Sequence, residues 1–102
     1  MRFALISDNH DTQTGLRLAG IEGVVVHERD EVIDALSAAM ADRSVAVVLI
    51  TEKLVDMCRT EVYDMKLSHA SPLIVEIPDR HGDGRSKDSI MKYINDAIGI
   101  KI

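Results

Sequence analysis

A polar turn near the N-terminus gathers the side chains whose types are best suited to chemistry. Asp8, His10 and Asp11 follow the apolar run of residues 3–6. Carboxylates and imidazole bind metal ions, but this spacing matches neither a calcium-binding EF-hand loop nor a zinc motif. Short-spaced polar residues in a turn more often face solvent or cap a helix. We therefore expect the turn to be structural, with a cation site as the alternative.

Other reactive side chains are scattered along the sequence. Cys58 is the only cysteine and lies on the apolar stripe of a predicted helix, which is typical of a buried core residue. The remaining histidines, expected at the surface, are His27, His69 and His81. Gly82 and Gly84 do not belong to a complete dinucleotide fingerprint, and the chain has no phosphate-binding Gly-x-x-x-x-Gly-Lys loop. The sequence thus predicts no catalytic residue, no metal and no cofactor.

The composition is that of one small globular domain. A length of 102 residues suits a single domain, and 46% apolar with 3% aromatic residues predicts a core of aliphatic side chains. The net charge of −5, without a basic cluster, argues against nucleic acid or an anionic membrane as the partner. A single cysteine excludes an internal disulfide and favours a reducing compartment. The N-terminal apolar run is too short for a signal peptide or a membrane span, so we expect no direct membrane insertion.

Apolar runs alternate with helical patterns, which indicates an α/β fold. The runs expected to form strands are residues 3–6, 21–26, 45–50 and 73–77. The third run is the most hydrophobic, so its strand is expected at the centre of the sheet, covered on both faces. Right-handed crossovers then give a small, doubly wound, four-stranded parallel sheet with flanking helices and the strand order 2-1-3-4.

The helix boundaries are predicted from capping residues. We expect Asp11 to cap a helix over residues 12–19 and Gly20 to end it. Gly15 inside this helix predicts close packing of the helix against a strand. Asp30 is expected to cap the second helix. Thr51 is expected to cap the third, a single helix whose apolar stripe runs from residue 54 to residue 65.

The first and third strands meet at the topological switch point, where doubly wound folds bind ligands. The residues expected to line this crevice are Asp8, Asn9, His10 and Thr51. A response-regulator receiver domain shares the architecture, but it needs a phosphorylatable Asp where this chain has Thr51 and Glu52, and a fifth strand that the pattern does not supply. An active receiver is excluded. A degenerate receiver-like domain that binds a small ligand or cation between Asp8 and Thr51 remains the alternative function.

The last part of the chain is predicted to be a loop followed by an amphipathic helix. We divide the chain into a receiver-like α/β domain (residues 1–78), a flexible hinge loop (79–85) containing Gly82 and Gly84, and a C-terminal helix (86–102). Ile90, Ile94 and Ile98 recur at helical spacing. This apolar stripe fits two roles equally well: covering one face of the sheet, or docking on a partner as a helix-in-groove or coiled-coil element.

Three stretches of the sequence resemble the F subunit of the V-type/A-type ATPases. Residues 11–21 (Asp-Thr-Gln-Thr-Gly-Leu-Arg-Leu-Ala-Gly-Ile) are similar to the first βα segment of that family, and residues 50–52 to the end of its third strand. Residues 72–78 (Pro-Leu-Ile-Val-Glu-Ile-Pro), with the glycine-containing loop and the amphipathic tail, are similar to its fourth strand and C-terminal region. The resemblance covers essentially the whole chain.

This resemblance implies a function without catalysis. The F subunit is a rotor component of the central stalk, in a complex that couples ATP synthesis or hydrolysis to ion or proton transport, and it binds the coiled-coil axle, which is the D subunit. The resemblance implies a cytoplasmic protein, peripheral to the membrane through the complex. Carried onto this chain, the hinge lies near Gly82 and Gly84, and the residues implied to bind the axle are Ile90, Met91, Ile94 and Ile98. The resemblance therefore favours the partner-docking helix.

Overall fold

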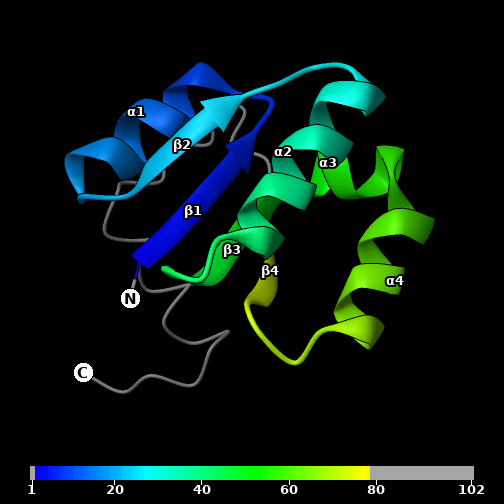
Figure 1. Cartoon of the computed structure of the whole chain (residues 1–102). Coiled ribbons are helices and arrows are strands. Elements are labelled where there is room, and N and C mark those ends of the chain that lie inside the picture. The colour runs from blue at the N-terminus through cyan, green and yellow to red at the C-terminus, as the bar shows by residue number, and fades with distance from the viewer. Residues whose placement is uncertain (1, 79–102) are drawn as a thin grey trace.

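A parallel sheet forms the body of the molecule. The computed structural model describes residues 2–78. Along the chain its elements are β1 (Arg2–Ser7), α1 (His10–Leu18), β2 (Glu22–Val25), α2 (Arg29–Ala41), β3 (Val45–Thr51), α3 (Glu52–Met57), α4 (Arg59–Ser68) and β4 (Leu73–Ile77). The strands pair in parallel in the order β2-β1-β3-β4, as the sequence predicts (Figure 1).

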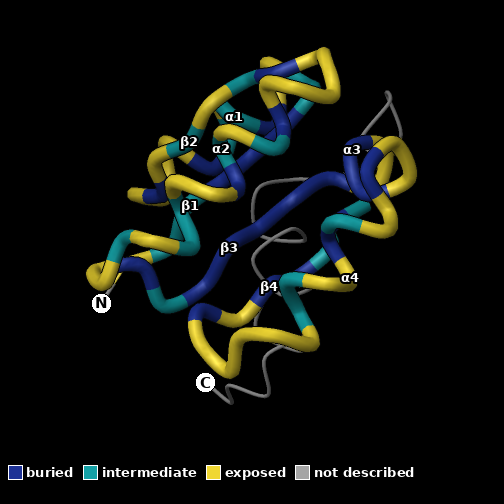
Figure 2. The backbone as a smooth tube through the Cα atoms, turned by 45° about the vertical axis from the view of Figure 1, so that its right-hand side comes forward, coloured by how far each residue is buried: buried dark blue, intermediate teal, exposed yellow. Residues whose placement is uncertain are grey.

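β3 occupies the centre of the sheet because its side chains are apolar on both faces. It pairs with β1 on one side and with β4 on the other. Val48, Leu49 and Ile50 are fully buried, although successive side chains of a strand point to opposite faces. Figure 2 shows β3 buried along most of its length. The predicted central strand, covered on both faces, is confirmed.

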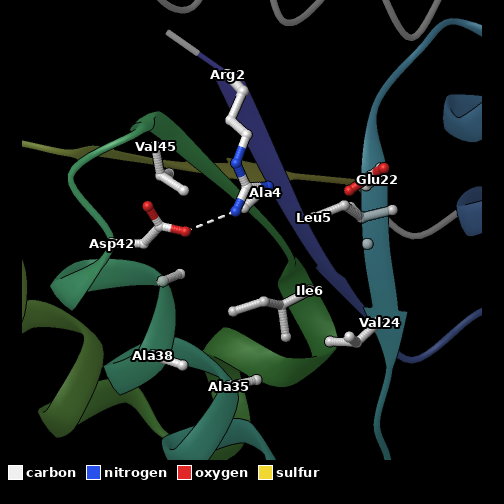
Figure 3. A pocket seen from close by; sticks show the side chains of 12 residues that line it. Arg2, Ala4, Leu5, Ile6, Glu22, Val24, Ala35, Ala38, Asp42 and Val45 are labelled. Atoms are coloured by element: carbon white, nitrogen blue, oxygen red, sulfur yellow. Dashed lines mark hydrogen bonds and ion pairs between the residues drawn. The ribbon is translucent and has the colours of Figure 1, made fainter.

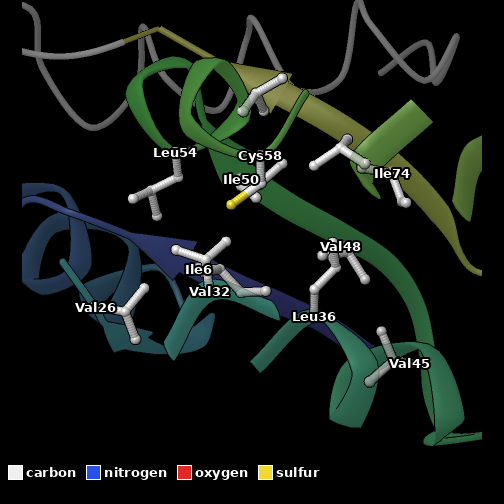
Figure 4. Close-up of a cluster of buried hydrophobic side chains, with 12 residues drawn as sticks. Ile6, Val26, Val32, Leu36, Val45, Val48, Ile50, Leu54, Cys58 and Ile74 are labelled. Atoms are coloured by element: carbon white, nitrogen blue, oxygen red, sulfur yellow. The ribbon is translucent and has the colours of Figure 1, made fainter. Parts of the chain in front are cut away.

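One face of the sheet is covered by α2, α3 and α4. Its buried cluster contains Ile6, Val48 and Ile50 from the sheet (Figure 4). The helices add Val32, Leu36, Leu54, Val55 and Val62 to this cluster. Apolar side chains recurring at helical spacing thus point from three helices toward the same face, which forms the larger part of the core.

The opposite face carries a second, smaller cluster. Leu16 of α1 packs there with Leu5 of β1 and Leu49 of β3. α1 lies mainly against β1 and β2. The β4 side chains of this cluster are Val75 and Ile77. The predicted hinge loop and C-terminal helix begin beyond β4 and lie outside the described residues.

α1 begins earlier than predicted because Asn9, rather than Asp11, is its N-cap. The side-chain oxygen of Asn9 accepts hydrogen bonds from the backbone N–H groups of Asp11 (2.7 Å) and Thr12 (3.2 Å). The predicted Asp11 cap is therefore wrong: Asp11 lies in the first turn, where its carboxylate suits the helix dipole. Gly20 has a φ of +88° and directly follows the C-cap residue of the helix, as predicted.

α2 also begins earlier than predicted. Glu28 is its N-cap, and Glu28 and Glu31 form a reciprocal capping box, so the predicted Asp30 cap is wrong. The carboxylate of Glu31 accepts hydrogen bonds from the backbone N–H groups of Glu28 and His27, at 3.0 and 3.1 Å. These bonds lower the pKa of Glu31. The capping box of Glu28 and Glu31 therefore sets the start of α2.

The glycines of α1 and β2 have opposite surroundings. A Cβ placed on Gly15 would meet nothing within 4 Å, so the predicted close packing of α1 at this residue is wrong. A Cβ on Gly23 would lie 2.5 Å from Cβ of Leu5 and 2.8 Å from its carbonyl oxygen. It is therefore β2, and not α1, that needs a glycine for close approach to β1.

The predicted third helix is broken into α3 and α4 at Cys58. The backbone of Cys58 leaves helical geometry (φ −127°, ψ 39°), while its N–H still donates to the carbonyls of Leu54 and Val55. The prediction of one continuous helix is wrong at this residue, although its apolar stripe continues across the break. Cys58 is buried, as predicted, and burial raises the pKa of its thiol.

Within residues 2–78, no helix has both the length and the apolar character needed to cross a bilayer.

Candidate functional site

The predicted crevice lies where β1 and β3 end, and two of its side chains bind each other. The Thr51 hydroxyl donates a hydrogen bond of 2.8 Å to Oδ1 of Asp8. Lys53, at the start of α3, places its Nζ 4.0 Å from Oδ2 of the same carboxylate. The Asp8 side chain is only 7% exposed, and Thr51 is fully buried. The pair therefore ties the ends of β1 and β3 together.

This arrangement changes the role expected for Thr51. The residue occupies the N-cap position of α3, as predicted, but its side chain makes no capping hydrogen bond. Its hydroxyl is turned to Asp8 instead. Lys53 was not among the predicted crevice residues, because a sequence pattern does not show how far a long side chain reaches.

The other predicted crevice residues do not converge on Asp8. Asn9 uses its side chain to cap α1, and its backbone is held by Ser7, whose hydroxyl accepts from the Asn9 N–H (2.9 Å) and donates to the Asn9 carbonyl (3.0 Å). His10 and Asp11 are exposed. In the described part of the chain, no group of three or more His, Cys, Asp or Glu side chains is placed to hold a metal ion. The turn shapes the start of α1.

A groove of about 300 Å³ opens elsewhere, between α2 and the β1–β2 side of the sheet (Figure 3). The apolar residues that line it are Ala4, Leu5, Ile6, Gly23, Val24, Ala35, Ala38, Ala39 and Val45. It exists because α2 presents alanines to this part of the sheet, and its volume is at the lower end of the range for ligand pockets. Glu22, Arg2 and Asp42 provide its charged groups.

One end of the groove is held by an ion pair. Nη2 of Arg2 lies 2.7 Å from Oδ2 of Asp42, and Ser44 donates to Oδ1 of Asp42 from its hydroxyl (2.7 Å) and from its backbone N–H (2.8 Å). The hydrogen bonds from Ser44, with Arg2 beside them, lower the pKa of Asp42 to about 2. Arg2 and Asp42 connect α2 to β1 and are engaged with each other, so Glu22 is the other charged group in a mainly apolar groove.

The predicted surface histidines that can be located are exposed. His27 and His69 lie at the surface, as predicted, and His81 lies outside the described residues. The predicted hinge and partner-binding residues also lie outside them; they are Gly82, Gly84, Ile90, Met91, Ile94 and Ile98. Their roles stay predictions, as does ligand binding at the crevice.

Comparison with known proteins identifies the family. The family described as ATP synthase (F/14-kDa) subunit matches residues 3–94 of this chain. The chain belongs to this family. The match covers all four strands except Arg2, the first residue of β1, and continues through Ile90 and Ile94 of the predicted C-terminal helix.

Relatives from archaea match over almost their whole length. The A-type ATP synthase F subunit of Methanothermobacter thermautotrophicus is 35% identical, over 97% of this chain and 93% of the relative. The F subunit of Methanocaldococcus jannaschii is 30% identical, over 100% of this chain and 99% of the relative. The F subunit of Thermococcus sibiricus is 31% identical, over 100% of this chain and 98% of the relative. The family resemblance inferred from three short motifs is confirmed, and the chain is a component of an ATP synthase-type complex.

Proposed function

We propose that this chain is a non-catalytic rotor subunit in the central stalk of an A-type rotary ATPase. In this role it binds the coiled-coil axle, the D subunit, and helps to couple ATP synthesis or hydrolysis to ion transport. It works on the cytoplasmic side, held at the membrane through the complex. The observation that carries the proposal is the match to F-subunit relatives over nearly the full length of both chains.

The chemistry of the described domain supports a role without catalysis. The Asp8 carboxylate is bound by Thr51, and the Ser7 hydroxyl is bound to the backbone of Asn9. A rotor component transmits force through contacts and needs neither a nucleophile nor a general base. It needs a body that does not deform, and the parallel sheet buried on both faces meets that need.

The attachment to the axle is assigned to the C-terminal helix. Its stripe of Ile90, Ile94 and Ile98, with Met91 beside it, has the spacing of a helix that lays one apolar face on a partner. Burying three isoleucine side chains contributes roughly 5–9 kcal/mol before the cost of ordering the tail is subtracted. In this proposal Gly82 and Gly84 act as the hinge that lets the predicted helix leave the sheet domain, because glycine adopts backbone conformations that other residues avoid.

A titration of the purified axle subunit with the full-length chain tests this attachment. Ile94→Asp places a charge on the apolar stripe and is expected to weaken binding by several kcal/mol. Ser89→Asp adds the same charge away from the stripe and serves as the matched control. Circular dichroism verifies that both variants keep the folded sheet domain.

The outcomes separate the possible roles of the tail. Loss of binding in Ile94→Asp alone supports a docking helix. Equal binding by the wild type and both variants assigns the axle contact to the sheet domain, and the tail then covers a face of the sheet. Failure of the wild-type chain to bind contradicts the proposed function itself.

A further inference from the structure

β2 is an edge strand: within the described part of the chain it pairs with β1 on one side and with no strand on the other (Figure 1). The backbone N–H of Val26 donates to the carbonyl of Ser7 at the end of β1. Successive residues of a strand turn their backbone groups to alternate sides, so Val24 also faces β1. Gly23 and Val25 therefore turn their N–H and C=O groups outward, and we call these outward groups the β2 edge.

An edge of this composition is prone to pair with another strand. Unpaired N–H and C=O groups are a template for a second chain, and natural edge strands are protected by charged side chains, proline or covering groups. Residues 23–26 are Gly-Val-Val-Val, without charge or proline. The side chain of Val24 is 47% exposed, so the strand also offers an apolar contact. Protection of the β2 edge has to come from another element.

Gly23 is the least shielded residue of the β2 edge, and packing requires it to be glycine. A Cβ on Gly23 would lie 2.5 Å from Cβ of Leu5, so a side chain does not fit there. Without a side chain, the residue itself leaves its outward carbonyl uncovered. α1 packs against β2 and covers this carbonyl: Nε2 of Gln13 donates a hydrogen bond of 3.0 Å to it.

The covered carbonyl is central to the pairing that a second copy of this chain would make. A two-fold antiparallel pair centred on Val24 places Gly23 of each copy opposite Val25 of the other. Residues opposite one another in this way exchange both of their N–H···O bonds. The two Gly23 carbonyls would accept about half of the bonds in the pair. The Gln13 amide occupies the position that the incoming Val25 N–H would take.

The side chains of β2 suit a second copy in the same register. Val24 would lie opposite Val24, where the strands approach most closely and apolar pairs stabilise a sheet. Glu22, the one charged residue of β2, would lie opposite Val26, so like charges would not meet. A second copy is therefore the partner that the unprotected edge would accept.

We propose that Gln13 protects the β2 edge from pairing with a second copy of this chain. Its amide replaces the N–H of an incoming strand at the one residue that cannot carry a shielding side chain of its own. This inference does not depend on the proposed function, because every group that it uses lies in α1, β1 and β2.

Sedimentation of the full-length chain at increasing concentration tests the protection. Gln13→Ala removes the amide, and Thr14→Ala shortens the neighbouring, exposed side chain of α1 as the matched control. Hydrogen exchange resolved by residue shows whether the amides of Gly23 and Val25 become protected. Thermal unfolding followed by circular dichroism verifies that both variants keep the fold.

The expected association constant of Gln13→Ala is at least about tenfold higher than that of the wild type, because two carbonyls become available to the incoming strand. Thr14→Ala is expected to associate like the wild type. The amides of Gly23 and Val25 are expected to become protected in the associated Gln13→Ala chain alone.

A second substitution in the Gln13→Ala background tests whether the association uses this strand. Val24→Lys places a charge at the centre of the pair and is expected to restore the wild-type association constant. Leu18→Lys makes a similar change at a side chain of α1 that is 74% exposed, and it is expected to leave the association of Gln13→Ala unchanged.

Other results overturn the proposal. A wild-type association constant in Gln13→Ala refutes it, and so does equal association of Gln13→Ala and Thr14→Ala. Association while Gly23 and Val25 still exchange freely shows that the contact lies elsewhere. Protection of these two amides in an associated wild-type chain shows that Gln13 does not block the edge. Equal suppression by Val24→Lys and Leu18→Lys shows a general effect of added positive charge.

Discussion

Removal of the Thr51 hydroxyl tests the contact that ties β1 to β3. Thr51→Val keeps the shape of the side chain but removes the 2.8 Å hydrogen bond to Asp8. The Asp8 carboxylate is 7% exposed, and its remaining charged neighbour, Lys53, is 4.0 Å away. A buried acceptor that loses its donor costs about 1–3 kcal/mol, and more when it carries a charge. We expect the free energy of unfolding to fall by about 2–3 kcal/mol.

Urea unfolding followed by circular dichroism measures this loss, and thermal unfolding gives a second readout. For a domain of this size the melting temperature is expected to fall by about 10–20 °C. Thr60→Val, on the exposed surface of α4, makes the same chemical change and is expected to alter stability by less than about 0.5 kcal/mol. Repeating Thr51→Val in an Asp8→Ala background should cost little, because no buried carboxylate is left without its donor. A loss in Thr51→Val no larger than that in Thr60→Val would refute the reasoning.

Further predictions concern single residues, each checked by urea unfolding. Gly23→Ala is expected to destabilise the fold by about 2 kcal/mol, because its Cβ would lie 2.5 Å from the Leu5 side chain of β1. Gly15→Ala, whose Cβ would meet nothing within 4 Å, is expected to stabilise the fold by up to about 1 kcal/mol. Equal effects of the two substitutions would contradict the packing. Thr12→Val should be neutral or stabilising, because the buried Thr12 hydroxyl has no hydrogen-bond partner among the described residues. Hydrogen bonds from Ser44 lower the pKa of Asp42 in the folded protein to about 2, below its ordinary value of 3.8. The ionised Asp42 therefore stabilises the folded state above pH 3.8, and this stabilisation is lost as the pH falls toward 2. Asp42→Asn should flatten stability over that window, and an unchanged profile would refute this.

The strands were predictable because each is a short apolar run, and burial on both faces of a parallel sheet requires such runs. The helix starts were less predictable. Asn9 and Asp11 are both preferred capping residues, two positions apart, and the choice between them depends on backbone geometry that composition does not encode. Glu28 is not a preferred N-cap type, so the sequence favours Asp30, whereas the capping box of Glu28 and Glu31 starts the helix two residues earlier. The break at Cys58 was missed because the apolar stripe runs unchanged through it.

The candidate site was predicted at the level of strand ends. Because the carboxyl ends of adjacent parallel strands lie together, Asp8 and Thr51 were expected to meet, and they do. That they bind each other was not predictable, since an Asp–Thr pair is compatible both with an open ligand site and with a closed structural bond. Family membership identified the complex to which the chain belongs, which neither spacing nor side-chain chemistry indicates alone.

Rotation of this protein during catalysis tests the central claim most directly. Cys58 is 1% exposed, so a cysteine introduced at the exposed Arg17 of α1 can carry a bead or dye selectively. The labelled chain is assembled into a rotary ATPase whose catalytic head is fixed to a surface, and ATP is added. We predict that the label turns in one direction and stops when ATP is withdrawn. A label that stays fixed relative to the head while the assembled enzyme hydrolyses ATP would contradict the rotor assignment.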